Sequence, residues 1–325
     1  MAECDCRQRQ TFSFELYPPR TGAAELALYR SLEHLVAARP EFISVTYGAK
    51  GSSSDRSLRM LRHVLNHTDV QPMAHLTCVG MSYPQASMLI HEFLDAGITS
   101  FLALRGDPPS DALEGESFLG DLGSASELVQ LIHRVHAERV PFTQRDVPGF
   151  PGAKRIAARQ KVTIAVAAFP NGHPRSRSVE QDIDTLLAKQ AAGANLAITQ
   201  LFFHASDYLG FVELARVAGV TMRILPGIMP VLSPSRLRRT LELTGGAMPV
   251  ELLRDLEAAE TAQAQARVGI NNATALCREL LDGGAGGLHL YTLNQHEAVL
   301  AVLRNVGLLG SPDPASSTTV PSNTE

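Results

Sequence analysis

The chain has 325 residues, of which 45% are hydrophobic and 19% are charged. Its 29 basic and 33 acidic side chains give a formal net charge of −4 at pH 7, and no basic run is available to neutralise phosphates, which argues against a nucleic-acid-binding protein. No apolar stretch reaches the ~18 residues of a membrane span, and the polar N-terminus lacks the apolar core of a signal peptide, so we expect a cytoplasmic protein.

Short apolar runs typical of buried parallel strands recur along the chain, and amphipathic helical segments separate them. The predicted strands are Thr11–Glu15, Phe42–Thr46, Pro72–Thr77, Ser100–Leu104, Thr163–Ala168, Leu196–Gln200, Arg223–Gly227 and Leu288–Tyr291. The predicted helices between them include Ala24–Ala38, Gln85–Ala96, Ala125–Ala137, Val179–Ala192 and Ala205–Ala218.

Eight strands alternating with helices predict an α/β fold, and specifically a (β/α)8 TIM barrel. An open doubly wound sheet would give the same local signals. The strand count favours the closed barrel, as does the absence of a Gly-x-Gly-x-x-Gly turn after the first strand.

The alternation assigns residues 11–309 to the barrel, after an N-terminal extension of residues 1–10. A Pro-, Gly- and Arg-rich insert at Val140–Lys161 is expected to form a surface loop or a subunit contact. Val250–Asp282 adds two helix-like stretches before the last strand. The Ser-, Pro- and Thr-rich residues 310–325 predict a disordered tail.

Polar side chains stand at the C-terminal ends of most predicted strands, where the loops of a TIM barrel form its active site. Glu15 lies in the apolar run Phe12–Tyr17, where an unpaired charge is costly, so a functional role is favoured over a solvated carboxylate. Arg105 and Asp107 are equally compatible with a structural ion pair, although Gly106 between them suggests a close backbone approach to a ligand.

The remaining candidates also have structural alternatives. His75 and His173 are compatible with structural histidines, and Gln200 with a loop cap. The cysteines are few and scattered, at Cys4, Cys6, Cys78 and Cys277, which fits a reducing compartment. No histidines and carboxylates share one element at metal-ligand spacing, so no metal is predicted.

Taken together, the strand-end motifs resemble those of the methylenetetrahydrofolate reductase family, in its bacterial type with the catalytic domain only. The resemblance extends, in order, from about Thr11 to Leu309. The motifs that carry it are Phe12-Ser13-Phe14-Glu15-Leu16-Tyr17-Pro18-Pro19-Arg20, Ser44-Val45-Thr46-Tyr47-Gly48-Ala49, His75-Leu76-Thr77-Cys78, Ala103-Leu104-Arg105-Gly106-Asp107-Pro108-Pro109, Ala168-Phe169-Pro170 with His173-Pro174, Ile198-Thr199-Gln200-Leu201-Phe202-Phe203, Pro226-Gly227-Ile228-Met229-Pro230 and His289-Leu290-Tyr291-Thr292-Leu293-Asn294.

The resemblance implies an oxidoreductase of one-carbon metabolism that reduces 5,10-methylenetetrahydrofolate to 5-methyltetrahydrofolate for methionine biosynthesis. It implies non-covalent, tightly bound FAD, with NADH or NADPH as co-substrate in a ping-pong reaction that passes hydride through the flavin N5. It also implies a homo-oligomer, a dimer or a tetramer.

Two carboxylates match catalytic positions of the family. Glu15 matches the general acid that protonates N10 and opens the five-membered ring to a 5-iminium cation. We expect burial among apolar neighbours to raise the pKa of Glu15 and keep its proton available near neutrality. Asp107 matches a carboxylate near the pterin and the flavin, where negative charge favours the cation.

Further positions match binding residues of the family. Those for FAD are Thr46, His75, Leu104, Arg105, Gly106, Asp107, Phe169, His173, Asp182 and Lys189, and those for folate are Gln200, Tyr291 and Leu293. Arg105 and Lys189 suit the pyrophosphate charge. Asp182 and Lys189 lie two helical turns apart, so one helix face would line the nucleotide half of the cofactor; a solvated helix face is the alternative.

The chain departs from the family mainly on the substrate side. Phe169 stands where the family often has tyrosine, Thr240 where an aromatic residue is common, and Gln295 where an arginine often meets the folate tail. Arg236, Arg238 or Arg239 are candidates to supply that charge. Two alternatives stay open: a flavin-barrel or flavin-free oxidoreductase for another one-carbon carrier, and a non-catalytic flavin- or folate-binding module.

Overall fold

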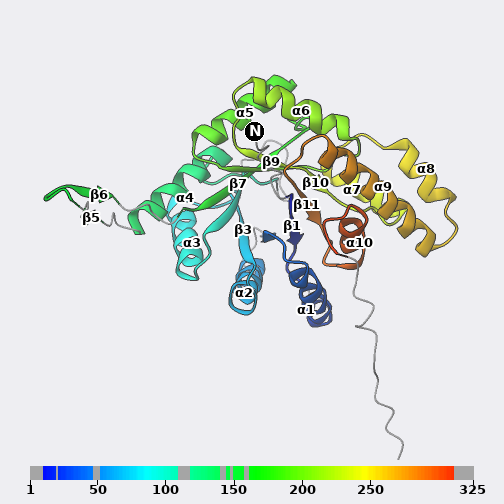
Figure 1. Cartoon of the computed structure of the whole chain (residues 1–325), viewed down its shortest axis with the longest axis horizontal. Coiled ribbons are helices and arrows are strands. Elements are labelled where there is room, and N and C mark those ends of the chain that lie inside the picture. Colours follow the sequence, from blue (N-terminus) through cyan, green and yellow to red (C-terminus); the bar gives the residue numbers. More distant parts are fainter. Residues whose placement is uncertain are drawn as a thin grey trace, which may run out of the picture.

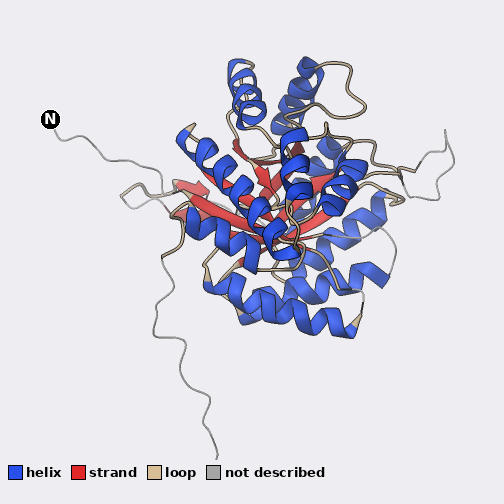
Figure 2. Cartoon of the chain, turned by 90° about the vertical axis from the view of Figure 1, so that its right-hand side faces the viewer, coloured by secondary structure: helices blue, strands red, loops and turns tan. Residues whose placement is uncertain are grey.

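The computed structural model describes residues 10–19, 21–46, 52–108, 118–139, 144–146, 149–156 and 161–310. Strands gather at the centre of the molecule and helices surround them (Figure 1, Figure 2). No helix in the described ranges is both long enough and apolar enough to cross a membrane. The N-terminal extension up to residue 9 and the predicted tail from residue 311 lie outside these ranges.

The core is one sheet of nine parallel strands in the order β10-β11-β1-β2-β3-β4-β7-β8-β9. The strands are β1 (Thr11–Leu16), β2 (Phe42–Val45), β3 (Gln71–Thr77), β4 (Ser100–Leu104), β7 (Thr163–Ala168), β8 (Leu196–Thr199), β9 (Arg223–Leu225), β10 (Gly227–Ile228) and β11 (Gly287–Tyr291).

The two ends of this sheet meet in a single chain segment, because β9 and β10 are separated only by Pro226. β9 pairs with β8, and β10 pairs with β11. Pro226 cannot donate to a strand ladder, but its carbonyl oxygen accepts a hydrogen bond from the backbone N of His289 at 2.9 Å. The segment therefore joins both edges, and the predicted (β/α)8 barrel is confirmed.

Ten helices are described: α1 (Gly22–Ala37), α2 (Ser52–His67), α3 (Tyr83–Asp95), α4 (Ala125–Arg139), α5 (Val179–Ala191), α6 (Ala205–Val217), α7 (Pro234–Thr244), α8 (Val250–Ala258), α9 (Ala262–Asp282) and α10 (Glu297–Asn305). Ser82, Ser178 and Ser233 cap α3, α5 and α7, each accepting a hydrogen bond from the backbone N–H three residues later. The extra helices predicted before the last strand are confirmed as α8 and α9.

The insert between α4 and β7, for which we expected a surface loop or a subunit contact, contains regular secondary structure. Its described parts form two short strands, β5 (Gln144–Asp146) and β6 (Lys154–Ile156), which pair antiparallel. The hairpin projects from the barrel on the side of α4 (Figure 1). Residues 140–143, 147–148 and 157–160 of the insert lie outside the described ranges.

Alternate residues of each barrel strand face the helices or the interior. On β1, Phe12, Phe14 and Leu16 belong to the apolar cluster between the sheet and the helices, so Ser13 and Glu15 face the interior. One side of the interior is apolar and contains Phe42, Met73, Leu102, Ala165, Leu196, Ile198 and Leu225.

A second part of the interior is polar and crosses the four neighbouring strands β3, β2, β1 and β11, of which β2 and β3 also contribute to the apolar part. It contains the buried side chains of Ser13, Ser44, His75 and His289. We call these four residues the polar strip. Because buried polar groups are costly unless they are paired, such a strip indicates a function beyond packing.

Candidate active site

Glu15 lies where the polar strip reaches the mouth of the barrel, by which we mean the C-terminal ends of its strands. The Glu15 side chain is 22% exposed. Its Oε1 accepts a hydrogen bond from Thr46 Oγ1 at 3.2 Å. The Nε2 atoms of His75 and His289 lie 3.6 and 3.7 Å from its Oε2. One carboxyl group thus has a hydroxyl and two imidazoles around it.

His289 and Ser13 form a second layer behind this carboxyl group. His289 Nδ1 lies 2.8 Å from Ser13 Oγ, and the ring stacks on Phe42 at 5.7 Å between centroids. Neither residue is among those that the motifs assign to the site. The two-residue period of a strand would have found them, because Ser13 precedes Glu15 by two positions and His289 precedes Tyr291 by two.

The expected rise in the pKa of Glu15 is wrong. Burial does raise the pKa of this carboxyl group, but the charge of His75, the hydrogen bond and charge of His289 and the Thr46 hydroxyl together hold the pKa below its ordinary value. Burial lowers the pKa of His75, and the negative charge of Glu15 opposes this effect. In the ligand-free protein, Glu15 is therefore ionised at neutral pH.

The residues after β4 form a turn that approaches the mouth. Leu104 packs against the apolar side of the interior. Gly106 has a φ of +86°, and a Cβ atom there would lie 2.4 Å from Val79 Cγ2, so the position requires glycine. Arg105 and Asp107 are both described, and no ion pair joins them. The Arg105 guanidinium instead lies over the Phe118 ring, and Asp107 is exposed.

The residues expected on α5 are buried, so the solvated-face alternative is wrong. Asp182 and Lys189 are 8% and 9% exposed. The Asp182 carboxylate accepts hydrogen bonds from the backbone N of His173 at 3.0 Å and from Ser176 Oγ. Lys189 Nζ donates to the carbonyl oxygen of Ala167 at 2.8 Å. Burial lowers the pKa of Lys189 to about 8, with Asp182 opposing this effect and Arg105 adding to it.

Two aromatic rings lie beside this pair. The Phe169 and His173 rings meet edge to face with 4.7 Å between centroids, and Lys189 Nζ lies 6.0 Å from the centroid of the Phe169 ring. Burial and the charge of Arg105 lower the pKa of His173. His173 Nδ1 accepts a hydrogen bond from the backbone N of Arg175, so the neutral ring carries its proton on Nε2.

The expected folate positions lie at the ends of β8 and β11. Tyr291 donates a hydrogen bond from its hydroxyl to the carbonyl oxygen of Thr199 at 3.0 Å, and Gln200 Oε1 accepts one from the backbone N of Leu201 at 2.9 Å. Leu293 has a φ of +50°, a conformation that costs energy for a branched side chain. Tyr291 and Leu293 both pack against the apolar cluster beneath α7 and α8.

The arginines considered for the folate tail differ in their contacts. Arg238 pairs with Glu257, and Arg239 pairs with Glu242 at 3.0 Å. Arg236 forms no ion pair with any residue in the described ranges. Thr240, on the same helix, is buried.

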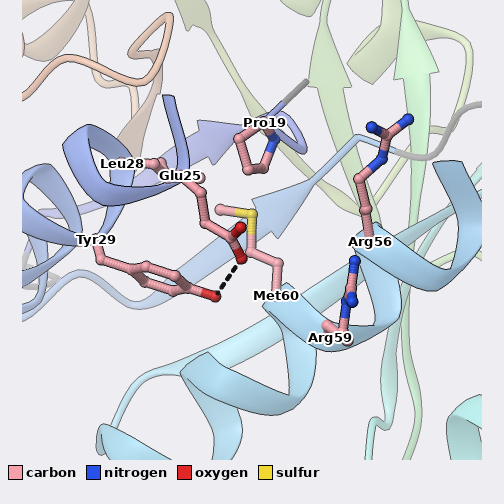
Figure 3. A pocket seen from close by; sticks show the side chains of 7 residues that line it. All are labelled: Pro19, Glu25, Leu28, Tyr29, Arg56, Arg59 and Met60. Carbon is pink, nitrogen blue, oxygen red and sulfur yellow. Dashed lines mark hydrogen bonds between the residues drawn. The ribbon is translucent and has the colours of Figure 1, made fainter. Parts of the chain in front are cut away.

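A separate small pocket lies between α1 and α2 (Figure 3). It is lined by Pro19, Glu25, Leu28, Tyr29, Arg56, Arg59 and Met60. Within it the Tyr29 hydroxyl donates to Glu25 Oε1 at 3.5 Å. None of the residues predicted for catalysis or binding lines this pocket.

The structure thus brings the predicted residues together in two groups. One surrounds Glu15 with Thr46 and His75, and the other joins Phe169, His173, Asp182 and Lys189. Asp107 and Gln200 make no direct contact with Glu15, but they follow β4 and β8 at the same end of the parallel barrel. Arg20, Tyr47-Gly48-Ala49 and Pro109 lie outside the described ranges, and within those ranges no three metal-ligating side chains gather.

The donor set at the mouth fits a polar cofactor with a diphosphate. His75 Nε2 and Thr77 Oγ1 are buried without a hydrogen-bond partner in the described structure. A Cβ atom at Gly106 would lie 3.1 Å from Thr77 Cβ, so glycine keeps the backbone close to this site. Arg105 and Lys189 supply positive charge beside it. This combination is compatible with the FAD that the motifs imply.

Comparison with known proteins agrees with the motifs. The sequence model of the family described as "Methylenetetrahydrofolate reductase" matches residues 2–307. The "5,10-methylenetetrahydrofolate reductase" of Escherichia coli (strain K12) is 31% identical over 297 residues, which cover 91% of this chain and 90% of that protein. The "Probable methylenetetrahydrofolate reductase (NADH)" of Oryza sativa subsp. japonica is 33% identical over 302 residues.

The rice alignment covers 93% of this chain, which spans about half (49%) of the length of that relative. A solved structure from Clostridium thermocellum, described as binding two copies of 5-methyl-5,6,7,8-tetrahydrofolic acid, aligns with a TM-score of 0.57 over 92% of this chain and 94% of that one. At 13% identity this likeness concerns the fold alone. On the family match and the E. coli alignment, the chain belongs to the methylenetetrahydrofolate reductase family.

Proposed function

We propose that this chain reduces 5,10-methylenetetrahydrofolate to 5-methyltetrahydrofolate, with bound FAD as cofactor and NADH or NADPH as reductant. Family membership supports the reaction. The observation that carries the proposal is the carboxyl group of Glu15 at the mouth, with the Thr46 hydroxyl and two imidazoles around it. When bound, the flavin accepts hydride from the nicotinamide and delivers it to the folate.

The residues that would hold FAD lie on β3 and β4, directly after β2, β4 and β7, and on α5. Arg105 and Lys189 would bind the diphosphate, because both are cationic and only the engaged carboxylate of Asp182 opposes Lys189. Leu104, Gly106 and Phe169 would contact the cofactor through backbone or ring, and Thr46, His75 and His173 through polar atoms. Asp182 would hold the loop after β7 through its bonds to His173 and Ser176.

In this proposal Glu15 is the general acid for the folate. The methylene bridge accepts hydride only after its ring opens, because the closed carbon is bonded to two nitrogens and carries no positive charge. Transfer of the Glu15 proton to N10 breaks the bond between N10 and the methylene carbon and leaves an iminium cation at N5. Asp107 would favour this cation through its negative charge, and Gln200 would hydrogen-bond the pterin.

The lowered pKa of Glu15 means that the acid must gain its proton when ligands occupy the mouth. Ligands that exclude water raise the pKa of a carboxyl group, because the charged form loses solvation. His289 is placed to serve both forms of Glu15, because its Nδ1 pairs with Ser13 while its Nε2, 3.7 Å from the carboxyl group, is free to face either the acid or the carboxylate.

The test uses purified protein reconstituted with FAD. We expect a yellow protein that absorbs near roughly 450 nm, is bleached by NADH or NADPH and regains its colour with methylenetetrahydrofolate. Glu15→Gln should keep flavin binding and bleaching but lose about 10²–10⁴-fold in the folate half-reaction, the usual contribution of a general acid. Glu33→Gln, an exposed change on α1, is the matched control and should leave both half-reactions unchanged.

Three outcomes would contradict this proposal. Normal folate turnover in Glu15→Gln would remove Glu15 from the acid role. Bleaching without recovery by folate would indicate a different one-carbon carrier, and FAD binding without bleaching would indicate a binding module. The cytoplasmic location, the homo-oligomeric assembly and the supply of methyl groups to methionine biosynthesis stay predictions from the resemblance.

A further inference from the structure

Two arginine side chains from different loops converge on one aromatic ring. The Cζ atom of Arg105, after β4, lies 5.7 Å from the centroid of the Phe118 ring. The Cζ atom of Arg175, in the loop between β7 and α5, lies 5.6 Å from the same centroid. Each guanidinium lies within cation–π range of the ring, and the two like charges repel each other, so the arrangement calls for a reason.

Phe118 is held firmly enough to support both side chains. Its carbonyl oxygen accepts a hydrogen bond from the backbone N of Gly80 at 3.0 Å. The next residue, Leu119, forms an antiparallel bridge with Val79. Gly120 N then donates to the carbonyl oxygen of Cys78 at 3.1 Å. The ring is therefore attached to the segment that extends β3 toward the mouth.

Arg175 is fixed beside the residues that the motifs assign to FAD. Its backbone N donates to His173 Nδ1 at 3.0 Å, and the His173 backbone N donates to the Asp182 carboxylate at 3.0 Å. Ser176, which follows it, bonds to the same carboxylate. The position of the Arg175 backbone thus depends on the contacts that order the rest of this loop.

Among the described residues, positive charges outnumber negative charges around Phe118. Arg105 acts electrostatically on both His173 and Lys189, so these groups share one neighbourhood. Neither the Arg105 nor the Arg175 guanidinium forms an ion pair with a carboxylate in the described ranges. Asp182 is already bonded to the loop. The described cations here are Arg105, Arg175 and Lys189, whereas of the two carboxylates Asp182 is engaged by the loop and Asp107 is exposed, so the balance favours an anionic ligand.

We infer that Arg175 binds the diphosphate of FAD together with Arg105, with Phe118 as the common support of the two guanidinium groups. The strand-end motifs do not include Arg175, and this assignment rests on the proposed function. The diphosphate of FAD would place two negative charges between the loop after β4 and the loop between β7 and α5. No ion pair joins these two loops in the described ranges. Arg175 thereby helps the protein to retain its cofactor.

The experiment compares flavins with and without the diphosphate. We would measure the Kd of FAD and of riboflavin for the apoprotein by flavin fluorescence, in wild type and in Arg175→Gln. The variant should bind FAD about 10- to 100-fold more weakly, as expected for the loss of charge-assisted hydrogen bonds, and riboflavin within about twofold of wild type. The FAD affinity of the variant should also fall less steeply with NaCl than that of wild type.

Arg177→Gln is the matched control, because Arg177 is exposed in the same loop and contacts Gln181 through its backbone N only. It should leave both affinities unchanged. Equal weakening of FAD and riboflavin by Arg175→Gln would assign Arg175 to loop structure and overturn the inference. Unchanged FAD affinity would overturn it while the proposed function stands. A wild-type protein that binds no flavin would overturn the proposed function and the inference together.

Discussion

At the scale of single residues, the balance around Glu15 decides when it carries a proton. Burial raises its pKa, whereas His75, His289 and Thr46 lower it, and the lowering wins in the ligand-free protein. His289 is fully buried and its Nδ1 is occupied by Ser13, so its ring cannot turn away without losing that contact. The low pKa is therefore a joint property of the interior faces of β1, β3 and β11 and of Thr46 at the end of β2.

Removing the His289 imidazole tests this balance. In His289→Gln the carboxyl group loses a nearby imidazole that lowers its pKa, so the pKa of Glu15 should rise. A higher pKa keeps the acid protonated to higher pH. The pH at which the folate half-reaction falls to half its maximum should therefore move upward, as measured by rapid mixing of the reduced enzyme with folate at a series of pH values.

His67→Gln is the control for this change, because His67 is exposed on α2. It should keep the wild-type pH profile. If His289→Gln slowed the reaction at every pH by the same factor, His289 would act through packing alone. Ser13→Ala is a milder test of the same balance, because it removes only the hydrogen-bond partner of His289 Nδ1.

The sequence motifs predicted Glu15, Thr46 and His75, and these do lie together at the mouth. They missed Ser13 and His289, because a serine and a histidine inside apolar strands look like packing residues until the strand period assigns them a face. The pKa of Glu15 was predicted in the wrong direction for the same reason. The apolar neighbours in sequence face the helices, and the groups that surround the carboxyl come from other strands.

At the scale of elements, closure of the barrel depends on the junction between β9 and β10. Gly227 N donates to Thr199 Oγ1 at 2.9 Å. A Cβ atom at Gly227 would lie 2.3 Å from the carbonyl oxygen of Thr199 and 2.8 Å from the Tyr291 ring. The backbone of Thr199 and the ring of Tyr291 therefore leave no room for a side chain at Gly227.

Gly227→Ala should accordingly destabilise the protein by about 1–3 kcal/mol, the usual cost of overpacking a dense site, as measured by urea unfolding of the apoprotein. Gly210→Ala, in the middle of α6, meets no atom within 4 Å and should instead stabilise by about 0.5–1 kcal/mol through helix propensity. Equal effects of the two substitutions would mean that the strand junction has no special packing.

Most strand and helix positions follow from local pattern, because covered parallel strands and amphipathic helices leave strong signals. The pairing of β5 with β6 does not follow from local pattern, because three-residue strands in a polar insert have no clear period. The polar strip was also hidden. Each of its four strands contributes one of these residues among apolar neighbours, and the strip exists only when the strands stand side by side.

At the scale of the whole molecule, the first and last strands build the site jointly. Thr292 Oγ1 donates to the carbonyl oxygen of Glu15 at 2.8 Å. The Asn294 amide accepts from the backbone N of Tyr17 at 3.0 Å and donates to its carbonyl oxygen at 2.8 Å. The position of the catalytic candidate therefore depends on closure of the barrel, and no fragment that lacks either end would hold it.

The folded protein also buries the ammonium group of Lys189, whose charged form is unfavourable without a ligand. The pH dependence of the free energy of unfolding should reveal this cost. Burial lowers the pKa of Lys189 from its ordinary 10.5 to about 8. Between these two values the unfolded chain binds a proton that the folded chain does not, so the free energy of unfolding rises with pH in that window.

From this group alone, we expect the apoprotein to be about 1 kcal/mol more stable at pH 9 than at pH 7. Lys189→Met should remove that rise and stabilise the apoprotein at pH 7 by about 1–3 kcal/mol, whereas Lys161→Met, at an exposed position, should do neither. FAD should flatten the wild-type rise, because a bound diphosphate favours the charged lysine. Parallel pH curves for wild type and Lys189→Met, measured by urea unfolding, would mean that the buried ammonium group is fully compensated by Asp182 and the Ala167 carbonyl.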